Sequence, residues 1–306
     1  MRFDPENVGF GRHETFALRY SWLPKGFQAL QDNPEIFSSE DATVVLGVGK
    51  NMVNAIRYWL LASQLIELNE GRGYQPTPVG EALFGKKGYD PYLEDEATIW
   101  LIHWLIVTNP QQATAWYWFF NEFHKPDFVS QEVATSLYDF VSQRKLKTAA
   151  TTVKNDASIV LRMYARSRGN GRTPIEEALD SPLALLNLIT QSPGGRSYTS
   201  RPSEREGLPI GILGYALADL FRNLELNELP IEDLMYSKEG IASPGAVFRL
   251  TENALITKLE KLMHEMPGVF EIRESAGIHQ CYLLEKVDPA VFIRFHYSSE
   301  TQEVAA

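Results

Sequence analysis

The chain has 306 residues, of which 44% are hydrophobic and 22% charged, a composition typical of a globular protein with two or three modules. No apolar run reaches the roughly 18–20 residues that a membrane span needs, and residues 1–5 lack the hydrophobic stretch of a secretion signal. The single cysteine, Cys281, excludes an intramolecular disulfide and a cysteine-based zinc site. These features predict a cytoplasmic protein without a membrane partner.

The net charge of −10 is distributed unevenly along the chain. Between residues 144 and 172 the only acid is Asp156, while the basic residues there are Arg144, Lys145, Lys147, Lys154, Arg162, Arg166, Arg168 and Arg172. Acids are concentrated instead at 90–96 and 219–239. A nucleic-acid binder needs a local basic face rather than a basic total. The basic segment therefore favours DNA as a partner, against the alternative of a solvated helix face paired with acids from elsewhere.

Residues 1–90 are predicted to form an N-terminal segment followed by a winged helix-turn-helix. The expected elements, in chain order, are a helix from Pro24 to about Leu30, a helix near 40–46, a tight turn at 47–49, an amphipathic helix over 50–63, and two short strands at 65–68 and 74–77. A glycine-rich turn joins the two strands into a hairpin. Helix, helix, turn, helix and hairpin is the element order of that fold.

The helix over 50–63 is the sharpest candidate for a DNA contact. Apolar residues share one of its faces and polar residues share another. Such a helix fits the major groove, where Asn, Arg and Lys reach base edges and phosphates. The predicted DNA-binding residues are Lys25, Lys50, Asn51, Asn54, Arg57, Arg72 in the hairpin turn, Lys154, Arg162 and Arg166. The alternative is a winged helix that contacts another protein.

The rest of the chain predicts a mainly α-helical protein with two further modules. Residues 91–192 are expected to form a central helical bundle, because the segments 98–107 and 111–123 are apolar on nearly every side. Residues 193–207 are rich in Gly, Pro, Ser and Arg and are expected to form a flexible loop. Residues 208–306 are expected to form a winged-helix-like α+β unit, with a helix that Thr251 caps and a hairpin at 269–284.

Catalytic candidates are few. His13 and Glu14 could supply a general base and a carboxylate that orients it, although a lone His beside a Glu is more often structural. The acidic run 94–96 could bind a divalent metal, but it precedes an apolar helix and is read preferentially as a helix cap. A phosphate-binding loop, a nucleophile elbow and a paired-histidine zinc motif are all missing from the sequence. The metal ligands therefore stay unassigned.

Two N-terminal motifs carry a resemblance to a known family. They are His13-Glu14-Thr15-Phe16 with Arg19, Trp22-Leu23 and Lys25-Gly26, and Leu46-Gly47-Val48-Gly49-Lys50-Asn51-Met52-Val53 with Ile56-Arg57-Tyr58-Trp59. With these motifs most of the chain resembles a bacterial family, long described as a domain of unknown function, whose members are similar to SspB. SspB is the second component of single-strand (Ssp-type) DNA phosphorothioation systems.

The resemblance implies a DNA-nicking activity that allows sulfur to replace a non-bridging phosphate oxygen, with Mg²⁺ or Mn²⁺ as the expected cofactor. It also implies three partners, namely a cysteine desulfurase, an ATPase and an enzyme of the phosphoadenosine-phosphosulfate-reductase type. Two alternatives remain open. One is a non-enzymatic winged-helix regulator, with the helical core supporting a homodimer, and the other is a scaffold that recruits an ATPase through its acidic face.

Overall fold

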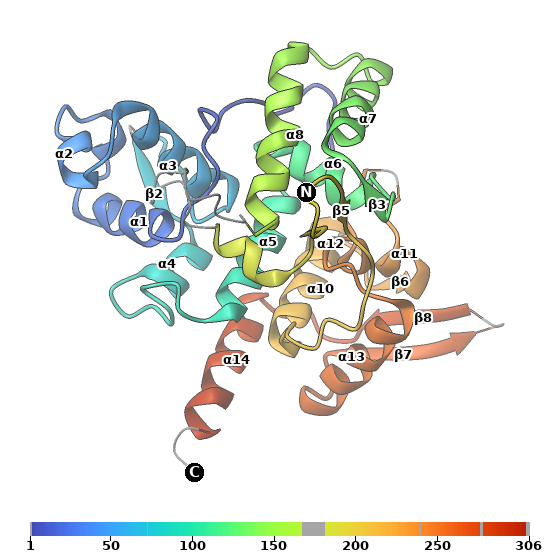
Figure 1. Ribbon diagram of the computed structural model, residues 1–306. Coiled ribbons are helices and arrows are strands. Elements are labelled where there is room, and N and C mark those ends of the chain that lie inside the picture. The colour runs from blue at the N-terminus through green and yellow to red at the C-terminus, as the bar shows by residue number, and fades with distance from the viewer. Residues whose placement is uncertain (1, 72, 167–180, 239, 276–277, 304–306) are drawn as a thin grey trace. The chain divides into compact units, whose positions relative to one another are not determined.

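The computed structural model describes residues 2–71, 73–166, 181–238, 240–275 and 278–303 (Figure 1). The chain divides into two compact units. The N-terminal unit comprises Asp4–Phe119 and Phe123–Arg201, and the C-terminal unit comprises Phe120–Glu122, the first residues and the chain from Pro202 onward. The described strands form three small antiparallel sheets, with the orders β1-β2, β3-β5-β4 and β6-β8-β7. The prediction of a mainly helical protein is confirmed.

The first part of the N-terminal unit has the element order that the sequence predicts. Its elements are α1 (Trp22–Asp32), the 3-10 helix η1 (Ile36–Ser38), α2 (Ala42–Leu46), α3 (Lys50–Ala62), β1 (Ile66–Leu68), β2 (Tyr74–Pro76) and α4 (Pro78–Phe84). Helices α1, α2 and α3 pack against one another. Ile66 pairs with Pro76 and Leu68 with Tyr74 in the hairpin. Arg72, the predicted contact in the hairpin turn, lies outside the described residues.

Helix α3 begins and ends where the sequence pattern predicts. Gly47 ends α2 in the left-handed region, with φ 60°, which costs a glycine little. Val53, Ile56 and Leu60 are buried on one face of α3, as predicted. Ser63 follows the helix and is also buried, with its hydroxyl donating to the carbonyl of Trp59 at 2.6 Å. Burial of this apolar face holds α3 on the unit and leaves its polar residues toward solvent.

An aromatic core fills the middle of the N-terminal unit. Helix α5 (Glu96–Val107) is buried from Ala97 to its end, as expected for a helix that is apolar on every side. The carboxylate of Asp95 accepts from the backbone N–H of Ala97 at 2.7 Å and caps this helix. Helix α6 (Thr114–Asn121) contributes Trp116 to the same core. The interpretation of the acidic run 94–96 as a helix start is therefore supported.

Helices α7 (Ser130–Gln143) and α8 (Ala150–Tyr164) complete the N-terminal unit and pack against each other. The sequence did not predict the sheet of β3 (Asp127–Phe128), β5 (Tyr198–Thr199) and β4 (Thr190–Gln191). Each strand has two residues, which is too short for a period-2 pattern to be visible. Strand β5 falls inside the segment 193–207, so part of the expected loop is a central strand.

The C-terminal unit combines helices with a three-stranded sheet. Its elements are α10 (Ile210–Leu224), β6 (Glu228–Pro230), α11 (Ile231–Met235), α12 (Pro244–Val247), α13 (Glu252–Glu265), β7 (Phe270–Ser275), β8 (Ile278–Leu283) and α14 (Ala290–Glu303). Thr251 caps α13 as predicted, because its hydroxyl accepts from the N–H of Ala254 at 3.2 Å. The predicted β7–β8 hairpin is present, and helix α10 packs against α14 and α13.

Candidate nucleic-acid interface

The start of α3 presents four of the predicted DNA-binding residues toward solvent. Lys50 and Asn51 are exposed in the first turn, and Asn54 and Arg57 are partly exposed further along the same side. Lys25 of α1 reaches the turn that precedes α3, because a methyl group on Gly47 would lie 3.4 Å from the Lys25 ammonium nitrogen. Helix α3 contains no acidic residue. Lys25 and the α3 residues thus form one basic and amide-bearing surface, and their role in DNA binding stays a prediction.

Helix α8 carries the second basic surface of the N-terminal unit. Lys154, Ser158 and Arg162 are exposed and follow each other at intervals of four residues, so they line one face of the helix. Arg166 is exposed just beyond the C-terminal end of the helix, whereas Arg168 and Arg172 lie outside the described residues. The only acid of α8, Asp156, is buried on the opposite side. The exposed face of this helix therefore bears positive charge that no acid of α8 offsets.

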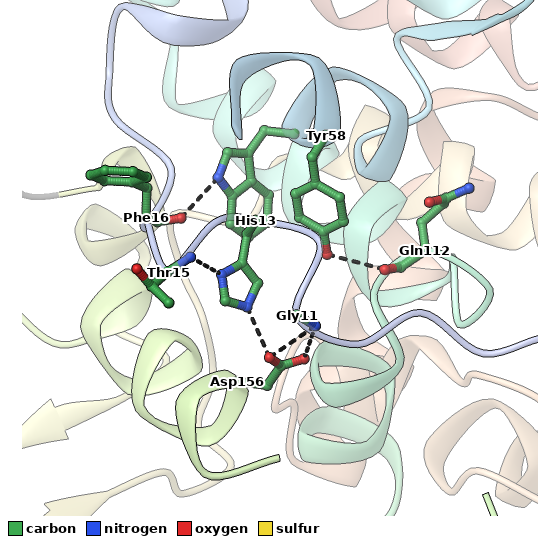
Figure 2. A network of polar contacts seen from close by, with 8 residues as sticks. Gly11, His13, Thr15, Phe16, Tyr58, Gln112 and Asp156 are labelled. Carbon is green, nitrogen blue, oxygen red and sulfur yellow. Dashed lines mark hydrogen bonds and ion pairs between the residues drawn. The ribbon is translucent and has the colours of Figure 1, made fainter. Parts of the chain in front are cut away.

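A buried pair, His13 and Asp156, joins the N-terminal segment to α8 (Figure 2). Both side chains are fully buried. The N–H of Thr15 donates to His13 Nδ1 at 3.1 Å, so the ring proton resides on Nε2, which donates to Asp156 Oδ1 at 3.0 Å. The N–H of Gly11 donates to both oxygens of the same carboxylate, each at 3.1 Å. Every polar atom of the His13 ring is thereby engaged in a structural contact.

Aromatic rings of α3 and α6 surround His13. The His13 ring is stacked on Trp59 of α3 with centroids 6.1 Å apart and an interplanar angle of 12°. Tyr58 and Trp116 complete the enclosure in edge-on geometry, with ring centroids 5.9 and 5.7 Å from the centroid of His13. The Trp59 indole N–H donates to the carbonyl of Phe16 at 3.2 Å, which ties the segment to α3 a second time (Figure 2). His13 thus lies between α3 on one side and Asp156 of α8 on the other.

Tyr58 extends the same network toward the start of α6. Burial raises the pKa of its hydroxyl well above the usual value, and the negative charge of Asp156 raises that pKa further. The hydroxyl is therefore a proton donor at physiological pH, and it donates to the backbone carbonyl of Gln112 at 3.1 Å (Figure 2). Gly9 adds two contacts with Thr114, one from its N–H to the Thr114 hydroxyl at 2.8 Å and one from its carbonyl to the Thr114 N–H.

We call residues 8–16 the strap, because they run across α3, α6 and α8 and are bonded to all three. The strap needs glycine at two positions of close approach. A Cβ on Gly9 would lie 2.4 Å from the carbonyl oxygen of Gln112, and one on Gly11 would lie 2.6 Å from Thr152 of α8. Gly11 also has φ +70°, which a side chain disfavours. The strap is thus an ordered loop that lies against three helices.

The structure corrects the expected pairing of His13 with Glu14. Asp156 supplies the carboxylate that orients His13, while the Glu14 side chain is exposed and the residue has φ 52°. The sequence argument relied on adjacency, but adjacent side chains diverge unless the backbone turns them together. The sequence signal that could have indicated the true partner is Asp156 itself, the single acid in a basic segment. A catalytic role for His13 or Glu14 stays a prediction. The contacts of His13 favour a role in holding the N-terminal segment against α3 and α8.

Other candidate catalytic groups have structural contacts. His103 Nδ1 lies 2.8 Å from the Tyr164 hydroxyl within the core. The carboxylate of Asp90 accepts from the N–H groups of Glu94 and Asp95, at 2.7 and 3.1 Å. Burial raises the pKa of the Cys281 thiol to about 12, which leaves it protonated and unreactive. Among the described residues, no group of three or more His, Cys, Asp and Glu side chains could hold a metal ion.

Comparison with known proteins gives this chain a family and a structural counterpart. Two crystal structures of SspB, one of them magnesium ion-bound, match with TM-scores of 0.85 and 0.84 and sequence identities of 26% and 27%. Each match covers 96% of this chain and 90% of the SspB chain, so the likeness extends over both units. No curated protein matches the sequence, and none of the described helices is long and apolar enough to cross a membrane. The SspB-like resemblance is confirmed. The family described as "Protein of unknown function (DUF4007)" matches residues 10–294, and the chain belongs to that family.

Proposed function

We propose that this chain is the DNA-binding component of a bacterial DNA phosphorothioation system and that it nicks DNA to admit sulfur. The observation that carries the DNA-binding part is that two helices, α3 and α8, expose basic residues and no acid of their own in a chain of net charge −10. The SspB likeness supports the place in a phosphorothioation system. Such a local basic face binds phosphate whatever the total charge of the chain.

The element order α1, α2, α3 and the β1–β2 hairpin supports a winged helix-turn-helix with α3 as the recognition helix. In this arrangement Asn51 and Asn54 read base edges in the major groove, and Lys50 and Arg57 bind the adjoining phosphates. Lys154, Arg162 and Arg166 of the α8 surface bind the phosphate backbone without reading sequence. We extend the same proposal to Lys25 beside the α3 turn and to Arg72 in the hairpin turn.

Lys50→Ala and Arg57→Ala should each weaken binding to duplex DNA and lower the salt slope by about one unit. The reason is loss of one phosphate contact, and neither side chain belongs to the buried face formed by Val53 and Ile56. Fluorescence anisotropy over a series of salt concentrations measures both quantities. Lys125→Ala is the matched control, because that lysine is paired with Glu132. Unchanged affinity in both α3 variants would remove α3 from the interface.

The nicking part of the proposal rests on the SspB-like family, and incubation with supercoiled plasmid plus Mg²⁺ or Mn²⁺ tests it. We expect conversion to the open-circular form by the chain alone or together with its partners. Those proposed partners are a cysteine desulfurase, an ATPase and a reductase-type sulfur-transfer enzyme, in the cytoplasm, with a homodimer as one assembly to be tested. Glu14→Gln is the informative variant, because the exposed carboxylate can be removed without disturbing the core. A normal nicking rate would exclude Glu14 from the chemistry.

One of the two SspB crystal structures is magnesium ion-bound. Among the residues that the structure of this chain describes, no group of three or more His, Cys, Asp and Glu side chains could hold such an ion. Three acids of the N-terminal unit have other contacts. Asp90 accepts two backbone N–H groups, Asp95 caps α5, and Asp156 holds His13 and Gly11. These three acids are therefore not proposed as metal ligands.

The scaffold alternative draws on the acidic surface of α11, where Glu232 and Asp233 both pair with Lys238. These contacts neutralise only part of the local negative charge. A scaffold would show neither DNA binding nor nicking, whereas a winged-helix regulator would bind DNA without nicking it. The plasmid and anisotropy experiments therefore separate the three functions.

A further inference from the structure

Arg12 lies on the strap, between Gly11 and His13. Its neighbour Gly11 is bonded through its N–H to Asp156 of α8, and its other neighbour, His13, is stacked on Trp59 of α3. The backbone of Arg12 is therefore fixed between α8 and α3 by contacts on both sides.

The Arg12 side chain is exposed and is held by neutral oxygens. One terminal nitrogen, Nη1, donates to the side-chain oxygen Oε1 of Gln112 at 2.9 Å, and the other, Nη2, donates to the carbonyl of Val8 at 3.3 Å. Neither acceptor carries a negative charge, so these contacts do not offset the positive charge of the guanidinium. Arg201 and Arg222 show the contrast, since each is paired with a carboxylate, of Asp127 and Asp219 respectively.

A guanidinium in this state is prepared to bind an anion. It has five N–H donors in a planar fork that matches a phosphate, and two hydrogen bonds leave further donors available. The bonds to Gln112 and Val8 fix the fork before the ligand arrives, which reduces the conformational entropy lost on binding. The buried carboxylate of Asp156 does not compete, because His13 and Gly11 already occupy it.

We propose that Arg12 binds a DNA phosphate, and that Gln112 is the positioning residue that orients its guanidinium. The inference rests on the proposed DNA-binding function and adds to it one residue of the strap, Arg12. The strap backbone at Arg12 is held in place, because the neighbouring His13 ring is stacked on Trp59 of α3 and bonded to Asp156 of α8.

Anisotropy with a duplex at several salt concentrations tests Arg12 directly. Arg12→Gln should weaken binding about eight-fold at 0.1 M salt and lower the salt slope by about one unit, the effect of one lost phosphate contact. Arg12→Lys should keep the slope and lose part of the affinity, because it keeps the charge without the fork. Arg201→Gln removes a paired charge from the same unit and should bind as the parent does. Parental affinity and slope in Arg12→Gln would overturn the inference.

A double-mutant cycle tests the positioning role of Gln112. Gln112→Ala changes no charge, and it should weaken binding when Arg12 is present but have no further effect in the Arg12→Gln background. An equal loss in both backgrounds would mean that Gln112 acts through the fold, and would overturn the positioning role. If the parent protein fails to bind duplex DNA, the proposed function fails and this inference fails with it. If Lys50→Ala weakens binding and Arg12→Gln does not, only the inference about Arg12 fails.

Discussion

Asp156→Ala will lower the free energy of unfolding by about 3–5 kcal/mol, the usual cost of breaking a buried, hydrogen-bonded pair by removing one partner. The carboxylate is fully buried and accepts from Gly11 and from His13. Its loss leaves those buried donors without an acceptor and removes the bond that holds the strap on α8. Urea denaturation followed by tryptophan fluorescence measures the change, because Trp59 and Trp116 both contact the His13 ring.

Asp156→Asn should lose clearly less stability than Asp156→Ala, because the amide oxygen can still accept a hydrogen bond from Gly11 or His13. Asp139→Ala is the matched control, since Asp139 is an exposed acid on the neighbouring helix α7 and should change stability by less than about 0.5 kcal/mol. If Asp156→Ala were as stable as the Asp139 variant, the strap would not depend on this carboxylate. The role of His13 as a positioning residue would then lose its support.

The sequence predicted well those features that depend on local chemistry. The apolar spacing of Val53, Ile56 and Leu60 identified α3, and a hydroxyl before an apolar run identified Thr251 as a cap. The acidic run before α5 was assigned to a helix start because Asp95 precedes an apolar segment, and Asp95 does cap that helix. Each of these inferences uses residues within about one or two turns of each other, where the backbone period fixes which side chains meet.

The functional contacts that sequence reasoning missed are those between distant segments. His13 and Asp156 are 143 positions apart, and Arg12 and Gln112 are 100 positions apart. No spacing rule connects such residues, because the fold alone determines which of them meet. The nearest carboxylate in the chain, Glu14, was therefore the natural choice, and it was the wrong partner. Asp156 was visible in the sequence only as the one acid in a basic segment. A single acid on an otherwise basic helix is a signal that its carboxylate is buried and has a partner in the core.

The same limit applies to the basic segment 144–172. The sequence shows which residues are basic, but it does not show which of them are exposed on one face of a helix. The structure separates it into a buried side with Asp156 and Val160 and an exposed side with Lys154 and Arg162. Arg144 is placed differently, with its guanidinium 4.2 Å from the centre of the Phe140 ring. The candidate phosphate contacts of α8 are therefore fewer than the basic residues of the segment, and their positions on one face make the next prediction specific.

Reversing two charges on that face, in the double variant Arg162→Glu with Arg166→Glu, will weaken duplex binding at least about 50-fold at 0.1 M salt. Each phosphate contact contributes about eight-fold there through counterion release, and two contacts are lost. The salt slope should fall by about two units. Both side chains are exposed, so the core of the N-terminal unit should stay intact. Anisotropy with several unrelated duplexes measures the loss, which should be the same for every sequence, because backbone contacts carry no base information.

The control for this double reversal must change the net charge by the same amount without touching α8. Arg222→Glu combined with Arg273→Glu does so, because both arginines are exposed and each is paired with a nearby carboxylate in the C-terminal unit. If the control weakened binding equally, the effect would come from total charge rather than from the α8 face. A loss confined to some sequences would instead place Arg162 or Arg166 against base edges. Parental affinity in the α8 variant would leave that helix as a solvated surface, and α3 with the strap would then account for all of the binding.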